Sequence, residues 1–168
     1  MKLTIYRIFS FLLMPVAVLF GITVLFLLGV ALSNPAMLLP LFLLACIVIY
    51  SFASLNFLIK GIDGKKYLKR SSKDWLKVNA YGSIVFAILI ISECLVFLFH
   101  PEVMKETMAQ AKQTSTQLNM NEADLKTYLT SVSYFLLVYG IVLLIHVIMS
   151  LQYVKQYNYL FQKEKNME

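Results

Sequence analysis

Charged residues are scarce in this chain. Asp, Glu, Lys and Arg make up 14% of its 168 residues, whereas an ordinary soluble domain carries about 25%. Apolar residues reach 60%, and a chain long enough for one domain cannot bury that much apolar surface in a core of its own. The composition therefore excludes a soluble enzyme and a disordered tail, and it indicates a membrane protein.

Cysteine and histidine are equally sparse. The two cysteines, Cys46 and Cys94, lie in apolar runs and lack the spacing of a disulfide framework or a zinc site. The two histidines, His100 and His146, fall near opposite ends of the predicted helices, so no shared metal site is expected. The sequence also lacks the G-x-S-x-G, H-E-x-x-H, P-loop and dinucleotide-binding motifs. We therefore predict no enzyme activity, no catalytic residue, no cofactor and no metal.

Long apolar runs are what the sequence has in abundance. A transmembrane helix needs about 20 predominantly apolar residues, and four runs meet that length: residues 8–32, 38–59, 78–99 and 131–153. The first run is longer than the apolar region of a signal peptide, which favours an uncleaved span. We predict a single membrane domain over residues 1–168, an all-α antiparallel bundle of four transmembrane helices.

The distribution of basic residues predicts the orientation of these spans. Of the 15 Lys and Arg residues, only three lie in the connection 100–130, and none lies between the first two spans. The others fall in the N-terminal segment, the connection 60–77 and the tail 154–168. By the positive-inside rule, both termini and the connection 60–77 are cytoplasmic. The predicted location is a plasma membrane, and the excess of Lys over Arg and the compact connections favour a bacterial inner membrane.

The basic connection also predicts contact with lipid headgroups. Each cation near an anionic surface contributes about 1 kcal/mol, and an aromatic residue beside it fits the membrane interface. We read the net charge of +6 as a mark of membrane orientation, and we expect no nucleic-acid partner. The predicted headgroup-anchoring residues are Lys65, Lys66, Lys69, Arg70, Lys73 and Trp75.

Two water-facing segments are predicted to contain helix. In the connection 100–130, an amphipathic helix follows Pro101, and Asn121 caps a second helix that continues into the fourth span. We interpret this connection as a small extracytoplasmic helical cap, which either binds a partner or covers apolar helix ends. In the tail, Tyr157 and Phe161 share a helical face, so the fourth helix is predicted to run on along the cytoplasmic surface.

Two ionisable residues lie inside the predicted spans, where an uncompensated charge is costly. At 1.5 Å per residue, Glu93 lies about 22 Å above the inner end of its helix and His146 about 10 Å above that of its own. This separation argues against a Glu93–His146 pair. Tyr139 lies at nearly the same depth as Glu93 and is its predicted hydrogen-bond partner.

Amide and hydroxyl groups complete the set of predicted intramembrane polar residues. Asn56 and Ser54 reach the depth of His146, and Asn79 shares a helical face with Glu93. In one interpretation these groups form hydrogen bonds between helices, and each bond stabilises the fold by about 0.6–2 kcal/mol. The other makes them a polar path for a proton, a cation or a small solute. The candidate residues are Glu93, Tyr139, His146, Asn56 and Asn79.

Two functions remain open on this evidence. The first is a non-catalytic integral membrane protein that acts through helix packing and partner contacts. The alternative is a small oligomeric transporter or channel subunit that uses Glu93, Tyr139 and His146. In both cases the lipid bilayer is the main partner, with a second copy of the chain or another membrane protein as further candidates.

Overall fold

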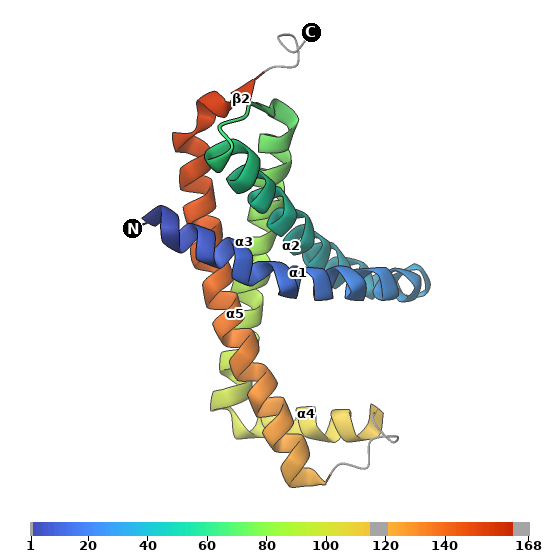
Figure 1. Cartoon of the computed structure of the whole chain (residues 1–168). Coiled ribbons are helices and arrows are strands. Elements are labelled where there is room, and N and C mark those ends of the chain that lie inside the picture. Colours follow the sequence, from blue (N-terminus) through green and yellow to red (C-terminus); the bar gives the residue numbers. More distant parts are fainter. Residues whose placement is uncertain (1, 115–120, 163–168) are drawn as a thin grey trace. The chain divides into compact units, whose positions relative to one another are not determined.

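The computed structural model describes residues 2–114 and 121–162, and these residues are almost entirely helical (Figure 1). Four of the helices in this part of the chain are long and apolar enough to cross a membrane. They confirm the predicted all-α fold with four helices of spanning length, and α4 is a shorter helix between α3 and α5. The α-helices are α1 (Lys2–Ser33), α2 (Leu38–Asn56), α3 (Arg70–Phe99), α4 (Pro101–Thr114) and α5 (Glu122–Gln156).

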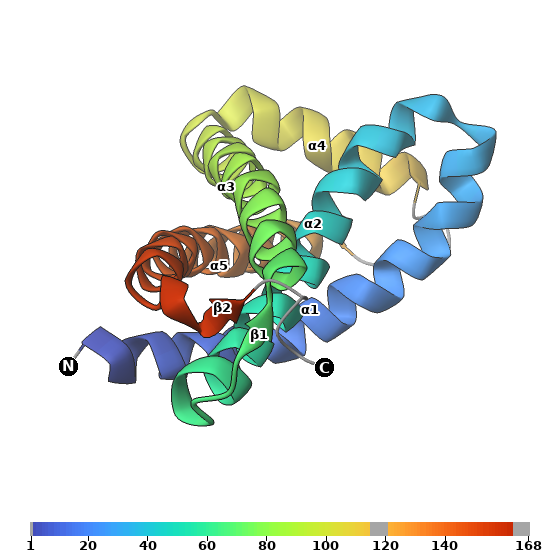
Figure 2. The ribbon, with the colours of Figure 1, turned by 90° about the horizontal axis from the view of Figure 1, so that it is seen from above.

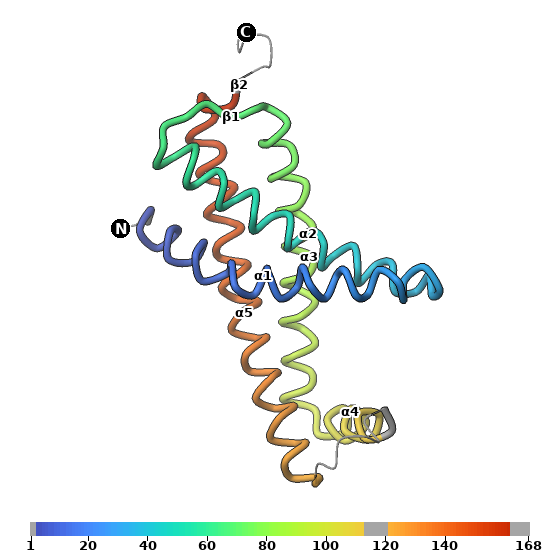
Figure 3. The backbone as a smooth tube through the Cα atoms, turned by 45° about the vertical axis from the view of Figure 1, so that its right-hand side comes forward, coloured from blue at the N-terminus to red at the C-terminus, as the bar shows by residue number. Residues whose placement is uncertain are grey.

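Short elements join these helices. A one-turn 3₁₀-helix, η1 (Pro35–Met37), links α1 to α2, and the Asn34 side chain accepts a hydrogen bond from the Ala36 backbone N–H at 3.2 Å. Asn and Pro favour such a turn, so α2 folds back along α1, as the tube in Figure 3 shows. The remaining short elements are the π-helix η2 (Phe57–Asp63), the strand β1 (Leu68–Lys69), the 3₁₀-helix η3 (Asn158–Leu160) and the strand β2 (Phe161–Gln162).

The connection between the second and third long helices is shorter than predicted. Helix continues from α2 through η2 to Asp63, and α3 already begins at Arg70. Leu58 and Ile62 are buried, because apolar residues on this stretch extend the packed face of α2. Most of the predicted connection 60–77 therefore belongs to helices.

The tail does not follow the prediction of a continued surface helix. Helix α5 ends at Gln156, and β2 pairs in parallel with β1, with Leu68 opposite Phe161. The view in Figure 2 shows the two strands side by side. Leu160 is buried, and the Phe161 ring stacks on Phe57 with 5.4 Å between ring centroids. The apolar residues of the tail thus pack on the protein instead of forming a lipid-facing stripe.

The chain divides into two compact units. The first comprises residues 1–86 and 142–168, so it contains α1, α2, the first part of α3 and the last part of α5. Its buried side chains come from all four of these helices, for example Leu13, Ile47, Ala80 and Leu143.

Two helices of the first unit approach closely at a glycine. A Cβ added to Gly82 of α3 would lie 2.6 Å from the Sγ and 2.8 Å from the Cβ of Cys46 on α2. Real Cβ atoms do not come that close to their neighbours, so this contact requires glycine. Cys46 is buried there as a small apolar side chain, as the sequence predicts.

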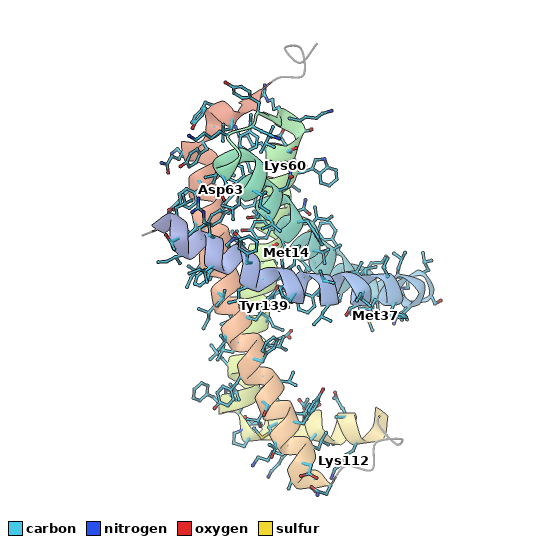
Figure 4. The ribbon with its side chains drawn as sticks, viewed as in Figure 1. Met14, Met37, Lys60, Asp63, Lys112 and Tyr139 are labelled. Atoms are coloured by element: carbon cyan, nitrogen blue, oxygen red, sulfur yellow. The ribbon has the colours of Figure 1, made fainter. Side chains whose placement is uncertain are left out.

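The second unit comprises residues 87–141, which include the end of α3, all of α4 and the start of α5. The Asn121 side chain accepts a hydrogen bond from the Asp124 backbone N–H at 2.8 Å, which confirms the predicted cap of α5. Lys112, labelled in Figure 4, donates to Glu122 at 3.0 Å and so joins α4 to the start of α5. Met108 of α4 and Leu125 of α5 are buried.

Apolar side chains dominate the exposed surface of the four long helices. In the most apolar stretch of each helix, only 11–33% of the residues are buried. Leu25, Phe26 and Leu32 of α1 are 74%, 77% and 81% exposed. Monomeric soluble proteins rarely expose apolar surface on this scale, and each of these helices is long and apolar enough to cross a membrane.

Candidate functional site

His146 is the most deeply buried ionisable group among the predicted intramembrane residues. Its side chain lies in the first unit and is 1% exposed. Both ring nitrogens are hydrogen-bonded: Nδ1 to the Tyr50 hydroxyl at 2.8 Å and Nε2 to the Ser10 hydroxyl at 2.9 Å. The imidazole is therefore held between α1 and α2.

The hydrogen bonds around Ser10 determine where the imidazole carries its proton. Ser10 Oγ donates its one proton to the Tyr6 backbone carbonyl at 2.8 Å. It must then accept from His146, so Nε2 carries the hydrogen and Nδ1 accepts from the Tyr50 hydroxyl. This assignment satisfies both nitrogens of a neutral imidazole, and no third proton is needed.

Three hydroxyl groups form a second set of hydrogen bonds beside the imidazole. The Tyr6 hydroxyl lies 2.7 Å from Ser54 Oγ and donates to Ser150 Oγ at 3.3 Å, and the two serine oxygens are 3.5 Å apart. Since Tyr6 has one hydroxyl proton, Ser54 donates to Tyr6, and Ser150 is left to donate to Ser54. The three groups close a small ring that needs no water.

We call these six side chains the hydroxyl–imidazole cluster. Two tyrosine rings also contact the imidazole. The Tyr6 ring stacks on it, parallel within 8° and with 4.8 Å between ring centroids, and the Tyr50 ring meets it edge-on with 5.7 Å between centroids. Every member is buried, and none carries a formal charge in this arrangement. The cluster consists of Tyr6, Ser10, Tyr50, Ser54, His146 and Ser150.

The cluster follows a simple spacing rule in the sequence, which depth along the helices does not reveal. Each of three helices contributes two residues four positions apart: Tyr6 and Ser10 on α1, Tyr50 and Ser54 on α2, and His146 and Ser150 on α5. Residues at this spacing lie on one face of a helix. Two of these pairs, Tyr50 with Ser54 and His146 with Ser150, lie within the predicted apolar runs. Of the third pair only Ser10 does, because Tyr6 precedes the run 8–32.

The predicted neighbours of His146 are correct only in part. Ser54 belongs to the cluster but bonds Tyr6 and Ser150, and the bond from α2 to the imidazole comes from Tyr50. Asn56 is half-buried and lines a separate pocket with Trp75. Depth along α2 predicts the correct level of the helix, but it does not predict which side of α2 faces α5.

Asn79 is also buried, and its hydrogen bonds stay within α3. Its side-chain nitrogen donates to the Trp75 carbonyl at 2.8 Å, and its own backbone carbonyl accepts from Ser83 Oγ at 2.8 Å. Both are local side chain–backbone bonds within one helix. Asn79 therefore shows no link to the hydroxyl–imidazole cluster.

Glu93 occupies a different environment, in the second unit. It is exposed and lines a cavity of about 440 Å³ between the end of α3, α4 and the start of α5. Among the described residues, no hydrogen bond or ion pair is recorded for its carboxylate, so the predicted bond to Tyr139 finds no support. Tyr139 is itself buried. We call this cavity the Glu93 groove.

The predicted headgroup-anchoring residues lie around the start of α3. Lys65, Lys66, Lys69, Arg70 and Trp75 are exposed. Lys73 is half-buried, and its Nζ donates to Asn158 Oδ1 at 2.6 Å, so it binds the tail of the chain. Nearby, Asp63 (labelled in Figure 4) pairs with Arg7 at 2.5 Å, so these two opposite charges offset each other.

The start of α4 carries a perturbed acid. His100 Nδ1 lies 3.0 Å from Glu102 Oε1. A hydrogen bond from its own backbone N–H, and then the imidazole of His100, lower the pKa of the Glu102 carboxyl below its ordinary value. This is the expected behaviour of an acid in the first turn of a helix.

Comparisons with known proteins add no assignment. No protein-family profile, curated protein or solved structure matches this chain. Within the described residues, no group of three or more His, Cys, Asp or Glu side chains is placed to hold a metal ion. The chemistry of the site must therefore be judged from its own geometry.

Proposed function

We propose that this chain is an integral membrane protein whose four long helices cross the bilayer as antiparallel neighbours. The exposed apolar surface of α1, α2, α3 and α5 supports the insertion, and the basic residues near the start of α3 support a cytoplasmic location for that side. Both ends of the sequence then lie in the cytoplasm, in a bacterial plasma membrane, and α4 lies outside.

The hydroxyl–imidazole cluster is the main observation that supports a non-catalytic protein. Its donors and acceptors are matched within the chain, from the two imidazole nitrogens to the ring of three hydroxyls. A general base or a relay needs a lone pair or a proton that the resting site leaves available. This closed, uncharged arrangement instead fits the role of a bond between helices.

Contacts with partners would then perform the biological role, and α4 is the element best suited to make them. It is the one helix of the described chain with a clearly polar face, which exposes Glu102, Lys105, Glu106 and Lys112. The proposed partner is a membrane-complex subunit or a second copy of this chain, bound on the outer side.

The alternative, a small oligomeric transporter or channel subunit, rests on Glu93. Its groove supports part of that hypothesis, because an acidic residue within a span marks a candidate solute site. The closed hydrogen bonding of the buried cluster argues against His146 as a second binding site on a transport path. Glu93 and Tyr139 lie in the second unit, whereas His146 lies in the first. The three residues therefore do not form one site within either unit.

A flux assay separates the two functions. Purified protein in sealed vesicles under a proton gradient is expected to pass protons no faster than protein-free vesicles. Proton flux that disappears in both Glu93→Gln and His146→Phe, and persists in the control His100→Gln, would contradict the non-catalytic proposal and favour the transporter.

A cross-linking assay tests the partner contact. A photoreactive amino acid at Lys105 on α4 should give one discrete protein adduct in intact cells, identified by mass spectrometry. The same amino acid at Phe26, an exposed position on α1, should give only lipid adducts. Lipid adducts alone at both positions would contradict the proposed role of α4.

A further inference from the structure

The Glu93 groove has the composition of a binding site for a small apolar molecule. Its volume of about 440 Å³ falls within the roughly 300–1,000 Å³ of ordinary ligand pockets, which are mostly apolar with a few polar groups. The groove follows that pattern, since one carboxylate and three hydroxyl groups stand among apolar walls. The walls include Ile90, Val96, Phe97, Val103, Leu129 and Leu136.

Within residues 2–114 and 121–162, the single charge in the groove has no counter-ion. No Lys or Arg lines the cavity, and no ion pair of the described residues involves Glu93. Counted from Phe99 at 1.5 Å per residue, Glu93 lies about 9 Å inside the end of α3. A carboxylate at that depth in a membrane is costly unless a cation or a proton accompanies it.

The chemistry of the lining restricts which cation fits. Calcium and magnesium require several oxygen ligands, commonly from more than one carboxylate, and no acidic cluster of metal-binding size exists in the described part of the chain. One of the three hydroxyls, Thr107 Oγ1, already donates to the Val103 carbonyl at 2.8 Å. One carboxylate among apolar walls is suited to a single, weakly hydrated positive charge on an apolar body.

We propose that the Glu93 groove binds a lipophilic organic monocation, such as a hydrophobic amine or an arylphosphonium. The apolar body lies against α3, α4 and α5, and the positive charge lies at the Glu93 carboxylate. The inference rests on the membrane insertion proposed above, because the outer part of the bilayer concentrates such cations beside the groove. It does not require transport.

Equilibrium dialysis with radiolabelled tetraphenylphosphonium tests this site on the full-length protein in detergent micelles. We expect saturable binding at one site per chain. Glu93→Gln should weaken it by about tenfold or more, since it removes the charge within a low-dielectric groove. The control Glu106→Gln makes the same change on the exposed face of α4, outside the groove, and should bind as the parent does.

A second variant and a neutral competitor distinguish the contribution of the apolar cavity to binding from that of the Glu93 charge. Ser133→Phe places a ring in the cavity while Glu93 remains, and it should weaken binding although the net charge is unchanged. Triphenylphosphine oxide, an apolar molecule with no net charge, should compete poorly. Gel filtration and circular dichroism establish that each variant is folded before it is compared.

Three results would overturn the proposal: undiminished binding in Glu93→Gln, undiminished binding in Ser133→Phe, or equal competition by the neutral compound. Failure of the parent to bind the cation at all would do the same. None of these results would bear on how many times the chain crosses the membrane, which a topology measurement decides separately.

Discussion

At the scale of single residues, the hydroxyl–imidazole cluster shows how polar groups are accommodated among apolar helices. Burying an unpaired polar group costs several kcal/mol in an apolar environment. Here Tyr50 and Ser10 bond both nitrogens of His146, and the Tyr6 hydroxyl joins Ser54 and Ser150. The cluster therefore favours one relative placement of α1, α2 and α5.

Removing one hydroxyl from this cluster should destabilise the fold. Tyr50→Phe keeps the ring but leaves Nδ1 of His146 without its donor. We expect the free energy of unfolding in micelles to fall by about 0.6–2 kcal/mol, the range of hydrogen bonds between membrane helices. The control Tyr81→Phe removes an exposed hydroxyl from α3 and should have little effect. Equal stabilities for the two variants would contradict the role given to Tyr50.

The acid at the start of α4 gives a prediction on pH dependence. The pKa of Glu102 is lowered by its own backbone N–H and by His100, so its ionised form stabilises the folded state. That contribution is fully present above the ordinary carboxyl pKa and is lost as the pH falls through the lowered pKa. Carbon-detected NMR titration of the Glu102 carboxyl measures the shift directly.

His100→Ala should move the pKa of Glu102 part of the way back toward its ordinary value. The return is only partial because the backbone hydrogen bond, which is the larger cause, remains. An unchanged Glu102 titration in this variant would show that the 3.0 Å contact with His100 does not form in solution.

The sequence predicts individual residues unevenly, for a physical reason. It predicts a His146 that is bonded to the second helix, and the structure has that bond through Tyr50. Depth along a helix does not indicate Tyr6 or Ser10, and Tyr6 lies outside the apolar run 8–32 of the predicted first span. Which faces of α1 and α5 meet depends on packing along both helices, which a single sequence does not state.

At the scale of elements, the approach of α2 and α3 depends on one glycine. Gly82→Ala would bring the new methyl group within 2.8 Å of Cys46 Cβ, so the helices must separate or shift. Overpacking of this kind costs about 1–3 kcal/mol of stability. Chemical denaturation in micelles measures the loss.

Gly29 provides the matched control for that substitution. A Cβ at Gly29 would meet nothing within 4 Å, so Gly29→Ala should leave stability unchanged or raise it by up to about 1 kcal/mol through better helix propensity. If Gly82→Ala proved as stable as Gly29→Ala, the close contact between α2 and α3 would be wrong.

The tail is the element that the sequence predicts least well. Its apolar residues repeat with helical spacing, yet α5 ends at Gln156 and the chain turns so that Phe161 stacks on Phe57. Local periodicity gave the wrong structure because contacts between distant segments override it. The pairing of β1 with β2 joins residues more than 90 positions apart, and no local pattern indicates it.

Phe161→Ala tests that contact between the tail and η2. Loss of the stacked ring should lower the free energy of unfolding by about 0.5–1.5 kcal/mol beyond the burial term. Tyr159→Ala removes a ring that is 65% exposed and should cost much less. Similar losses for the two variants would indicate that Phe161 does not pack on Phe57 of η2.

At the scale of the whole molecule, the four long helices are the best-predicted feature. Their existence follows from the length and apolarity of four runs in the sequence. The thickness of the bilayer sets the length that a spanning helix needs, so this prediction requires no knowledge of how the helices pack. The cap of α5 at Asn121 and the helix after Pro101 also follow from local signals. The closed cluster and the Glu93 groove do not, because they require several helices to be placed at once.

The central claim is that these helices cross a membrane with the Lys66 side in the cytoplasm. Reporter fusions at Lys66, Lys112 and Glu168 test it most directly, with green fluorescent protein for cytoplasmic sites and alkaline phosphatase for external ones. The account predicts fluorescence at Lys66 and Glu168 and phosphatase activity at Lys112. Phosphatase activity at Lys66, or the same side for Lys66 and Lys112, would contradict it.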